Sequence, residues 1–240
     1  MNQEKGYAEA EREYFNDTFL KGGTWVWPEK VPEWAGGAAA QEEFYTALRE
    51  AWTTSSDPRK KMLVAQHSGP EVWNRLLGDE NEMVRAAVAL AGDESVHRVL
   101  ATDSSQLVRE YVADYCSPLV LRCMADHETD ANILYHIAQR KDRPAQSILV
   151  ARCWNQPDFL KKIVPLLSQA EKDHLLTHEA PEVRLRVGEY GNRRQARAVM
   201  EDRDIPETQK MFVEDRLQEF EDIAQALTPL PLERQMEVSL

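Results

Sequence analysis

The residues best placed to do chemistry are two histidines, His174 and His178, which lie four residues apart with Glu179 beside the second. On a helix this spacing can put both imidazoles on one metal ion. The sequence lacks the H-E-x-x-H pattern of zinc peptidases and offers no clear third ligand. A metal hydrolase is therefore only the third hypothesis, and we expect no bound metal and no cofactor.

Motifs for nucleophilic catalysis and phosphate binding are missing as well. The chain has no G-x-S-x-G, no P-loop and no G-x-G-x-x-G, although a triad assembled in space would leave no such mark. The sequence therefore names no catalytic residue and favours a non-enzymatic protein.

The cysteines and the hydropathy pattern point to the compartment. Cys116, Cys123 and Cys153 form no paired framework, and we expect them to be reduced, buried thiols. The first fifteen residues are charged where a secretory signal would be apolar, and no apolar run is long enough to span a membrane. These features predict a cytoplasmic protein that does not act at a membrane.

Charge is unevenly distributed along the chain. The net charge is −12, with −5 on residues 1–56, −2 on 57–202 and −5 on 203–240, and an acidic protein repels polyphosphate at long range. Two basic clusters interrupt this pattern: Arg140, Lys141, Arg143, Arg152, Lys161 and Lys162 form the first, and Arg184, Arg186, Arg193, Arg194 and Arg197 form the second. They are either solvated faces with acidic neighbours or, if folding brings them onto one face, a groove for a phosphate backbone.

A repeat organises the middle of the chain. Three columns, with one residue from each repeat, show it. The first column comprises Val64, Val88, Val112, Ile137, Ile163 and Val187, and the second, four residues earlier, comprises Lys60, Val84, Val108, Ile133, Phe159 and Val183. The third column, twelve residues after the first, comprises Leu76, Leu100, Met124, Leu149, Leu175 and Val199. Seventeen of these eighteen residues are apolar, and successive spacings in the first column are 24, 24, 25, 26 and 24 residues. The residue after the first column is Ala or Gly in five of six units, which predicts a close approach of backbones there.

Each repeat reads as a helix, a turn and a shorter helix. In DENEMVRAAVALAG, residues 79–92, the apolar residues follow helical spacing. We expect Asp79 and Asp103 to be helix N-caps and Gly92 to end its helix. One such unit cannot bury its apolar stripe alone, whereas stacked units share a core. The sequence therefore predicts an all-α solenoid.

Three segments make this prediction more specific: DENEMVRAAVALAGDESVHRVLATD, DSSQLVREYVADYCSPLVLRCMAD and EAPEVRLRVGEYGNRRQARAVMED. They resemble units of the leucine-rich repeat variant family, which belongs to the HEAT-like class, and the resemblance extends over about six units in residues 57–202. It implies a right-handed superhelix in which α and 3-10 helices alternate. An iron–sulfur cluster found in a family prototype is not expected, because residues 1–115 contain no cysteine.

The same resemblance implies a ladder of charged pairs along the stack. A repeated Val-Arg pair supplies Arg85, Arg109 and Arg184, and Asp79 and Asp103 each stand six residues before an arginine. We expect structural pairing of these residues. The alternative is an arginine that binds an anionic ligand.

Residues 1–56 and 203–240 do not follow the repeat and are expected to be helical caps. A loop in the first segment carries Trp25, Trp27 and Trp34, which either cover the apolar end of the solenoid or anchor a partner. Residues 203–228 are expected to form one capping helix, followed by a mobile tail over 229–240. Its apolar stripe comprises Met211, Phe212, Leu217, Phe220, Ile223 and Leu227.

The leading hypothesis is a protein-binding repeat scaffold, such as a bacterial or phage adaptor, inhibitor or immunity-type protein with a basic partner. Its expected contact residues are Trp25, Trp27, Trp34, Arg109, Tyr111 and Tyr115. The alternative is a HEAT-like DNA-binding or DNA-repair protein that uses the basic clusters at 140–162 and 184–197. Its contacts would be Arg140, Lys141, Arg143, Arg193, Arg194 and Arg197. The oligomeric state stays open.

Overall fold

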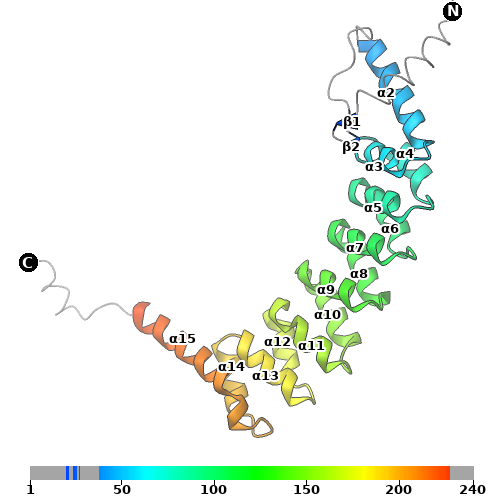
Figure 1. Ribbon diagram of the computed structural model, residues 1–240. Coiled ribbons are helices and arrows are strands. Elements are labelled where there is room, and N and C mark those ends of the chain that lie inside the picture. The colour runs from blue at the N-terminus through cyan, green and yellow to red at the C-terminus, as the bar shows by residue number, and fades with distance from the viewer. Residues whose placement is uncertain (1–19, 22–23, 26, 28–37, 228–240) are drawn as a thin grey trace, which may run out of the picture. The chain divides into compact units, whose positions relative to one another are not determined.

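The structure is a computed structural model that describes residues 20–21, 24–25, 27 and 38–227 (Figure 1). The chain divides into two compact units, Met1–Met124 and Ala125–Leu240. Helices dominate both units, and the described strands are limited to the short antiparallel pair β1 (Leu20–Lys21) and β2 (Thr24–Trp25). This confirms the predicted all-α repeat fold. The predicted boundaries after residues 56 and 202 stay a prediction.

Helices alternate between a first and a second helix of each repeat, as predicted. The first helices are α3 (Pro58–Gln66), α5 (Glu82–Ala91) and α7 (Gln106–Tyr115), then α9 (Ala131–Gln139), α11 (Pro157–Ile163) with the 3-10 turn η1 (Val164–Leu166), and α13 (Pro181–Tyr190). The second helices are α4 (Pro70–Leu76), α6 (Glu94–Leu100), α8 (Pro118–His127), α10 (Arg143–Arg152), α12 (Gln169–Leu175) and α14 (Arg193–Met200). They are flanked by α2 (Ala38–Thr53), by the 3-10 turn η2 (Glu207–Gln209) and by α15 (Met211–Leu227).

The predicted apolar columns form the core of each unit. Val64, Val88 and Val112 are fully buried in the first unit, and Ile137, Ile163 and Val187 are fully buried in the second. The small residues of the next column are buried too, which lets successive first helices pack closely within each unit. At Gly188 an added Cβ would lie 2.9 Å from the Cβ of Val199, so the predicted close approach holds there.

Helix starts differ from the prediction by two residues. Asn81 and Ser105 are the N-caps of α5 and α7, whereas Asp79 and Asp103 precede them. The carboxylate of Asp79 accepts the N–H of Asn81 at 3.0 Å, and Asp103 accepts the N–H of Ser105 at 2.8 Å. The two aspartates thus fix the turn before the helix rather than its first residue, which corrects the predicted N-caps.

Gly92 ends α5, as predicted, but for a steric reason. Its φ of −77° is open to other residues. An added Cβ would lie 2.5 Å from a methyl carbon of Val96 and 2.7 Å from the carbonyl oxygen of Val88. Glycine is therefore required by close packing and not by a left-handed backbone.

The second helices are short α-helices, where the resemblance implied 3-10 helices. Ala101 donates its N–H to the carbonyl of His97 at 2.9 Å, four residues back, which is the α pattern. Within the described ranges, 3-10 turns occur at η1 and η2. Pro165 lies within η1, where its missing N–H favours such a break.

Polar side chains of the second helices satisfy carbonyls at the ends of the first helices, a feature that the sequence did not reveal. The donors Trp73, His97 and Gln146 lie 2.8, 2.8 and 3.1 Å from the carbonyl oxygens of Ala65, Ala89 and Ala138, each eight residues earlier. Carbonyls in the last turn of a helix lack helical partners. The repeated contact therefore explains why polar residues occupy an otherwise apolar interface.

The two flanking helices behave differently. Phe44, Leu48 and Trp52 of α2 are buried, so this helix contributes to the core of the first unit. In α15 only Val213 is buried, in a cluster with Ala196, Val199 and Ile205.

The predicted capping helix needs two corrections. It begins at Met211 rather than at 203, because Pro206 and η2 precede it. Its predicted stripe is not a buried face, since Leu217 and Phe220 are half-buried and the other four members are exposed: Met211, Phe212, Ile223 and Leu227. The packed apolar residues of α15 are Val213 and Leu217, in its first two turns, so most of the stripe covers no apolar surface in the described structure.

Candidate interaction surface

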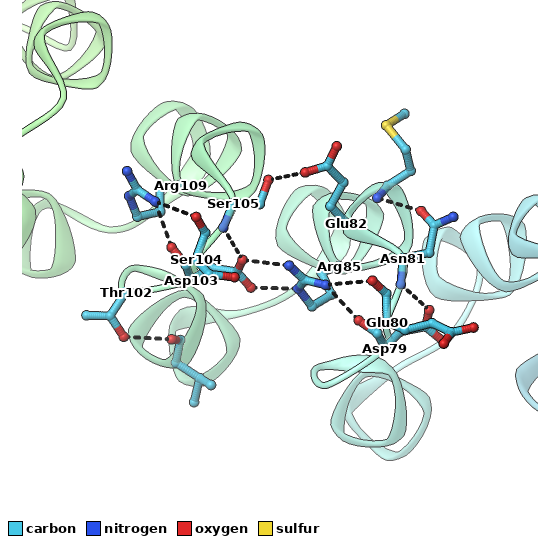
Figure 2. A network of polar contacts seen from close by, with 12 residues as sticks. Asp79, Glu80, Asn81, Glu82, Arg85, Thr102, Asp103, Ser104, Ser105 and Arg109 are labelled. Atoms are coloured by element: carbon cyan, nitrogen blue, oxygen red, sulfur yellow. Dashed lines mark hydrogen bonds and ion pairs between the residues drawn. The ribbon is translucent and has the colours of Figure 1, made fainter.

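A charged ladder connects successive repeats (Figure 2). The guanidinium of Arg85 forms two bonds with the carboxylate of Asp103, Nε to Oδ2 at 2.7 Å and Nη2 to Oδ1 at 2.8 Å. Its Nη1 donates to the carbonyl of Asp79 at 2.7 Å. Each arginine was expected to pair with the aspartate six residues before it. That residue supplies its main-chain carbonyl, and the carboxylate comes from the next repeat.

The same connection recurs 18 residues apart elsewhere. Lys61 contacts Asp79 at 2.6 Å in the first unit, and Arg184 contacts Asp202 at 2.6 Å in the second. The hydrogen bond from Arg184 is the main reason why the pKa of Asp202 lies below its usual 3.8. The predicted structural ladder is therefore confirmed for these pairs.

Arg109, one of the predicted contact residues, belongs to this ladder. Its Nη1 donates to the carbonyls of Asp103 and Ser104 at 2.7 and 3.3 Å (Figure 2). The side chain is half-buried. Arg109 therefore helps to hold the turn before α7.

Tyr111 and Tyr115, on the same helix, have a different environment. Their ring centroids are 6.2 Å apart at an interplanar angle of 18°, so the rings stack along α7. Tyr115 is 54% exposed. Since α7 is fixed by the buried Val108 and Val112, the two rings form a preorganised aromatic surface.

The three tryptophans cannot be treated alike. Trp27 stacks on His67 at 4.8 Å, meets the ring of Trp52 edge-on at 5.7 Å and is half-buried. This packing favours the covering role over the anchoring role for Trp27. Of Trp25 the structure describes the backbone, in β2, and Trp34 lies outside the described residues.

The histidine pair is built into the repeat. Nδ1 of His178 accepts the N–H of Ala180 at 3.0 Å, so its Nε2 carries the proton and donates to the carbonyl of Trp154 at 2.7 Å. His178 thus takes the turn-fixing position that Asp79 and Asp103 hold in other repeats. The ring of Trp154 lies 4.9 Å from His174 and 4.6 Å from His178. No group of three or more His, Cys, Asp or Glu in the described part of the chain could hold a metal ion.

The exposure of each cysteine depends on its position in the repeat. Cys116 and Cys153 are buried, as predicted, whereas Cys123 is exposed, which contradicts the prediction. Cys123 lies 24 residues after Val99, which is exposed as well. This repeat position therefore faces outward, and the thiol there is not part of the core.

The second basic cluster is interleaved with acidic residues. Arg193 pairs with Glu221 at 3.5 Å, Arg194 pairs with Asp173, and Arg197 is exposed on the same helix. A phosphate backbone would have to compete with these carboxylates.

Three of the six residues of the first basic cluster lie around a tight turn. Arg140 and Lys141 lie in the turn between α9 and α10, with Lys141 at a φ of 56°, and Arg143 begins α10. Arg152 instead donates to the carbonyls of Ala125 and Glu128. DNA binding by either cluster stays a prediction.

A groove between α13 and α15 was missed in the sequence. It has a volume of about 630 Å³ and is lined by Arg186, Glu189, Tyr190, Phe212, Arg216 and Glu219, among others. Both helices carry the same pattern, R-x-x-E-aromatic, at 186–190 and 216–220. The pattern was visible, but only the packing of α13 against α15 brings its two copies together.

The comparisons with known proteins bear on the fold. A solved structure described as "a leucine-rich repeat variant with a novel repetitive protein structural motif" is similar over 89% of this chain and 83% of that one, with a TM-score of 0.56 and 19% identity. At this identity the likeness shows the fold alone. No protein-family model matches the chain, and the search of curated proteins gives no match. None of the described helices is both long and apolar enough to cross a membrane.

Proposed function

We propose that the protein is a non-enzymatic repeat scaffold that binds another protein through the stacked pair Tyr111 and Tyr115. The observation that carries this proposal is a stacked aromatic pair, with Tyr115 exposed and Tyr111 half-buried, on a helix that is fixed by the adjacent buried Val108 and Val112. Tyrosine gives a large contact area at a low cost in conformational entropy, and it is enriched at interfaces.

The charges around this pair favour a basic partner. Glu110 and Asp114 lie on the same helix as the tyrosines, and the whole chain carries −12. Complementary charge speeds association and excludes acidic competitors. An adaptor, inhibitor or immunity-type role would use such a surface without any reaction chemistry.

The test is affinity capture from the native host with the full chain. The Tyr111→Ser/Tyr115→Ser variant should lose a partner that the unchanged protein retains. Val99→Ser is the matched control, because Val99 is 56% exposed on α6 of the same unit. Retention of the same proteins by the tyrosine variant would refute the proposal, provided that circular dichroism shows all variants folded.

A further inference from the structure

The terminal helix α15 turns large apolar side chains toward solvent. Phe212, Ile223 and Leu227 are 62%, 56% and 77% exposed. Eleven residues of α-helix are close to three full turns, so Phe212 and Ile223 share one face, and Leu227 follows one turn later. The neighbouring face of the helix packs against α14, through Val213 and Leu217. These three side chains form an apolar stripe that extends over about 22 Å and is left uncovered in the described structure, with Arg216 and Glu219 between Phe212 and Ile223 on the same side of the helix.

Acidic residues flank this stripe. Within α15, Glu214, Asp215, Glu219, Glu221 and Asp222 face a single basic residue, Arg216. Arg216 is held by Glu219 at 2.7 Å and lies over the ring of Phe220 at 4.6 Å. Arg193 of α14 reaches Glu221 at 3.5 Å, whereas Glu214 and Asp215 make no ion pair among the described residues.

The groove beside the stripe repeats this chemistry. On α13, Arg186 is paired with Glu189 at 2.6 Å and lies over the ring of Tyr190 at 4.2 Å. Both arginines of the groove are thus engaged by a glutamate and an aromatic ring. Its carboxylates outnumber its arginines, with Asp215 as the third, and Phe212 gives it an aromatic wall.

We infer that the face formed by α15 and the adjoining groove binds a basic, amphipathic helix of a partner protein. The stripe places apolar anchors at i, i+11 and i+15 for a helix packed along it, and the flanking carboxylates match lysine or arginine beside those anchors. A second copy of this chain is disfavoured as the occupant, because it would place two helices of net charge −4 against each other. This surface is separate from the tyrosine pair and goes beyond the proposed function.

The experiment uses the full chain and two synthetic helical peptides of about 20 residues. One carries a leucine seam flanked by lysines, and its twin has glutamate in place of every lysine. Fluorescence anisotropy should show binding of the lysine peptide, weakening as salt is raised, and no binding of the twin. Phe212→Ser/Ile223→Ser should weaken binding by about tenfold or more, and Glu214→Gln/Asp215→Asn should weaken it and reduce its salt dependence. Val99→Ser should leave it unchanged.

Three results would overturn the inference. The lysine peptide could fail to bind, it could bind the Phe212→Ser/Ile223→Ser variant equally well, or sedimentation could show a dimer that this variant abolishes, which would make a second copy the occupant. Phe212 and Ile223 are exposed, so the variant should fold, and circular dichroism checks this. The Tyr111→Ser/Tyr115→Ser variant should keep full peptide affinity, so either proposal can fail without the other.

Discussion

The guanidinium of Arg85 joins two repeats through a carboxylate and two carbonyls, and little of it reaches solvent. Replacing it by methionine, as Arg85→Met, leaves the carboxylate of Asp103 mostly buried without its bidentate partner. We expect a loss of about 3 kcal/mol in the free energy of unfolding by urea. The exposed pair of Arg98 and Glu94 is the control, and Arg98→Met should cost about 0.5 kcal/mol or less. Equal losses for both variants would refute the structural role of the ladder.

The pair of Arg184 and Asp202 should make stability depend on pH in a defined direction. The pKa of Asp202 is lower in the folded chain than its usual 3.8, so the unfolded chain binds the proton more readily. The pair therefore stabilises the folded chain when the pH is above 3.8, and this contribution is lost as the pH falls below that value.

Asp202→Asn provides the comparison. The difference in unfolding free energy between the unchanged protein and this variant should shrink between about pH 5 and about pH 2. Urea titrations across this range measure it. A constant difference would show that the carboxylate gains nothing from ionisation in the folded state.

The aspartates show what sequence reasoning can and cannot reach for a single side chain. Their spacing from the arginines was correctly connected to a ladder. The partner of each arginine was not, because a carboxylate 18 residues away competes with one six residues away, and only the packing of repeats decides between them. The position of the N-cap was missed for a related reason, since a carboxylate can accept a hydrogen bond from either the turn or the helix start.

At the level of helices, the close contact between α13 and α14 gives a sharp test. Gly188→Ala places a Cβ 2.9 Å from the Cβ of Val199, and such overpacking costs about 1–3 kcal/mol. The gain in helix propensity offsets about 1 kcal/mol of this. We expect a net loss of stability in thermal unfolding.

Two further variants separate steric strain from other effects. Gly78→Ala is the control, because nothing lies within 4 Å of its added Cβ, and it should be close to neutral. In the Gly188→Ala background, Val199→Ala should cost less than it does alone, since it removes the clash. Additive losses in the double variant would contradict the close approach.

The buried face of a helix could be predicted from the sequence inside the repeats, but not for the helix that follows them. The valine and alanine columns were found because each repeat buries the same positions against its neighbours. α15 shows the same periodicity, but a stripe in the sequence does not say whether a surface exists to cover it. The final helix packs on one side only, so Phe212 and Ile223 lie in solvent and become candidates for binding.

The molecule as a whole combines a repeat fold that resembles a solved structure with exposed side chains that are particular to this chain. The likeness to the leucine-rich repeat variant structure concerns the stacking of helices. Function must therefore be sought in exposed side chains such as Tyr115 and Phe212, which the packing of the repeats does not need. Tyr115 could be identified from the sequence because its place in the repeat predicts an exposed residue. The groove of Arg186 and Arg216 could not, because it depends on the contact between α13 and α15.

The central claim is that each repeat is stabilised by its neighbours through the buried valine columns, and hydrogen exchange in a Val112→Ala variant tests it most directly. The substitution removes buried methyl groups at a cost of about 2 kcal/mol. In a repeat stack this loss should stay local. We predict faster amide exchange in α5 and α7, with α13 and α14 unchanged. Equal acceleration in all four helices would mean one cooperative core and would contradict the account.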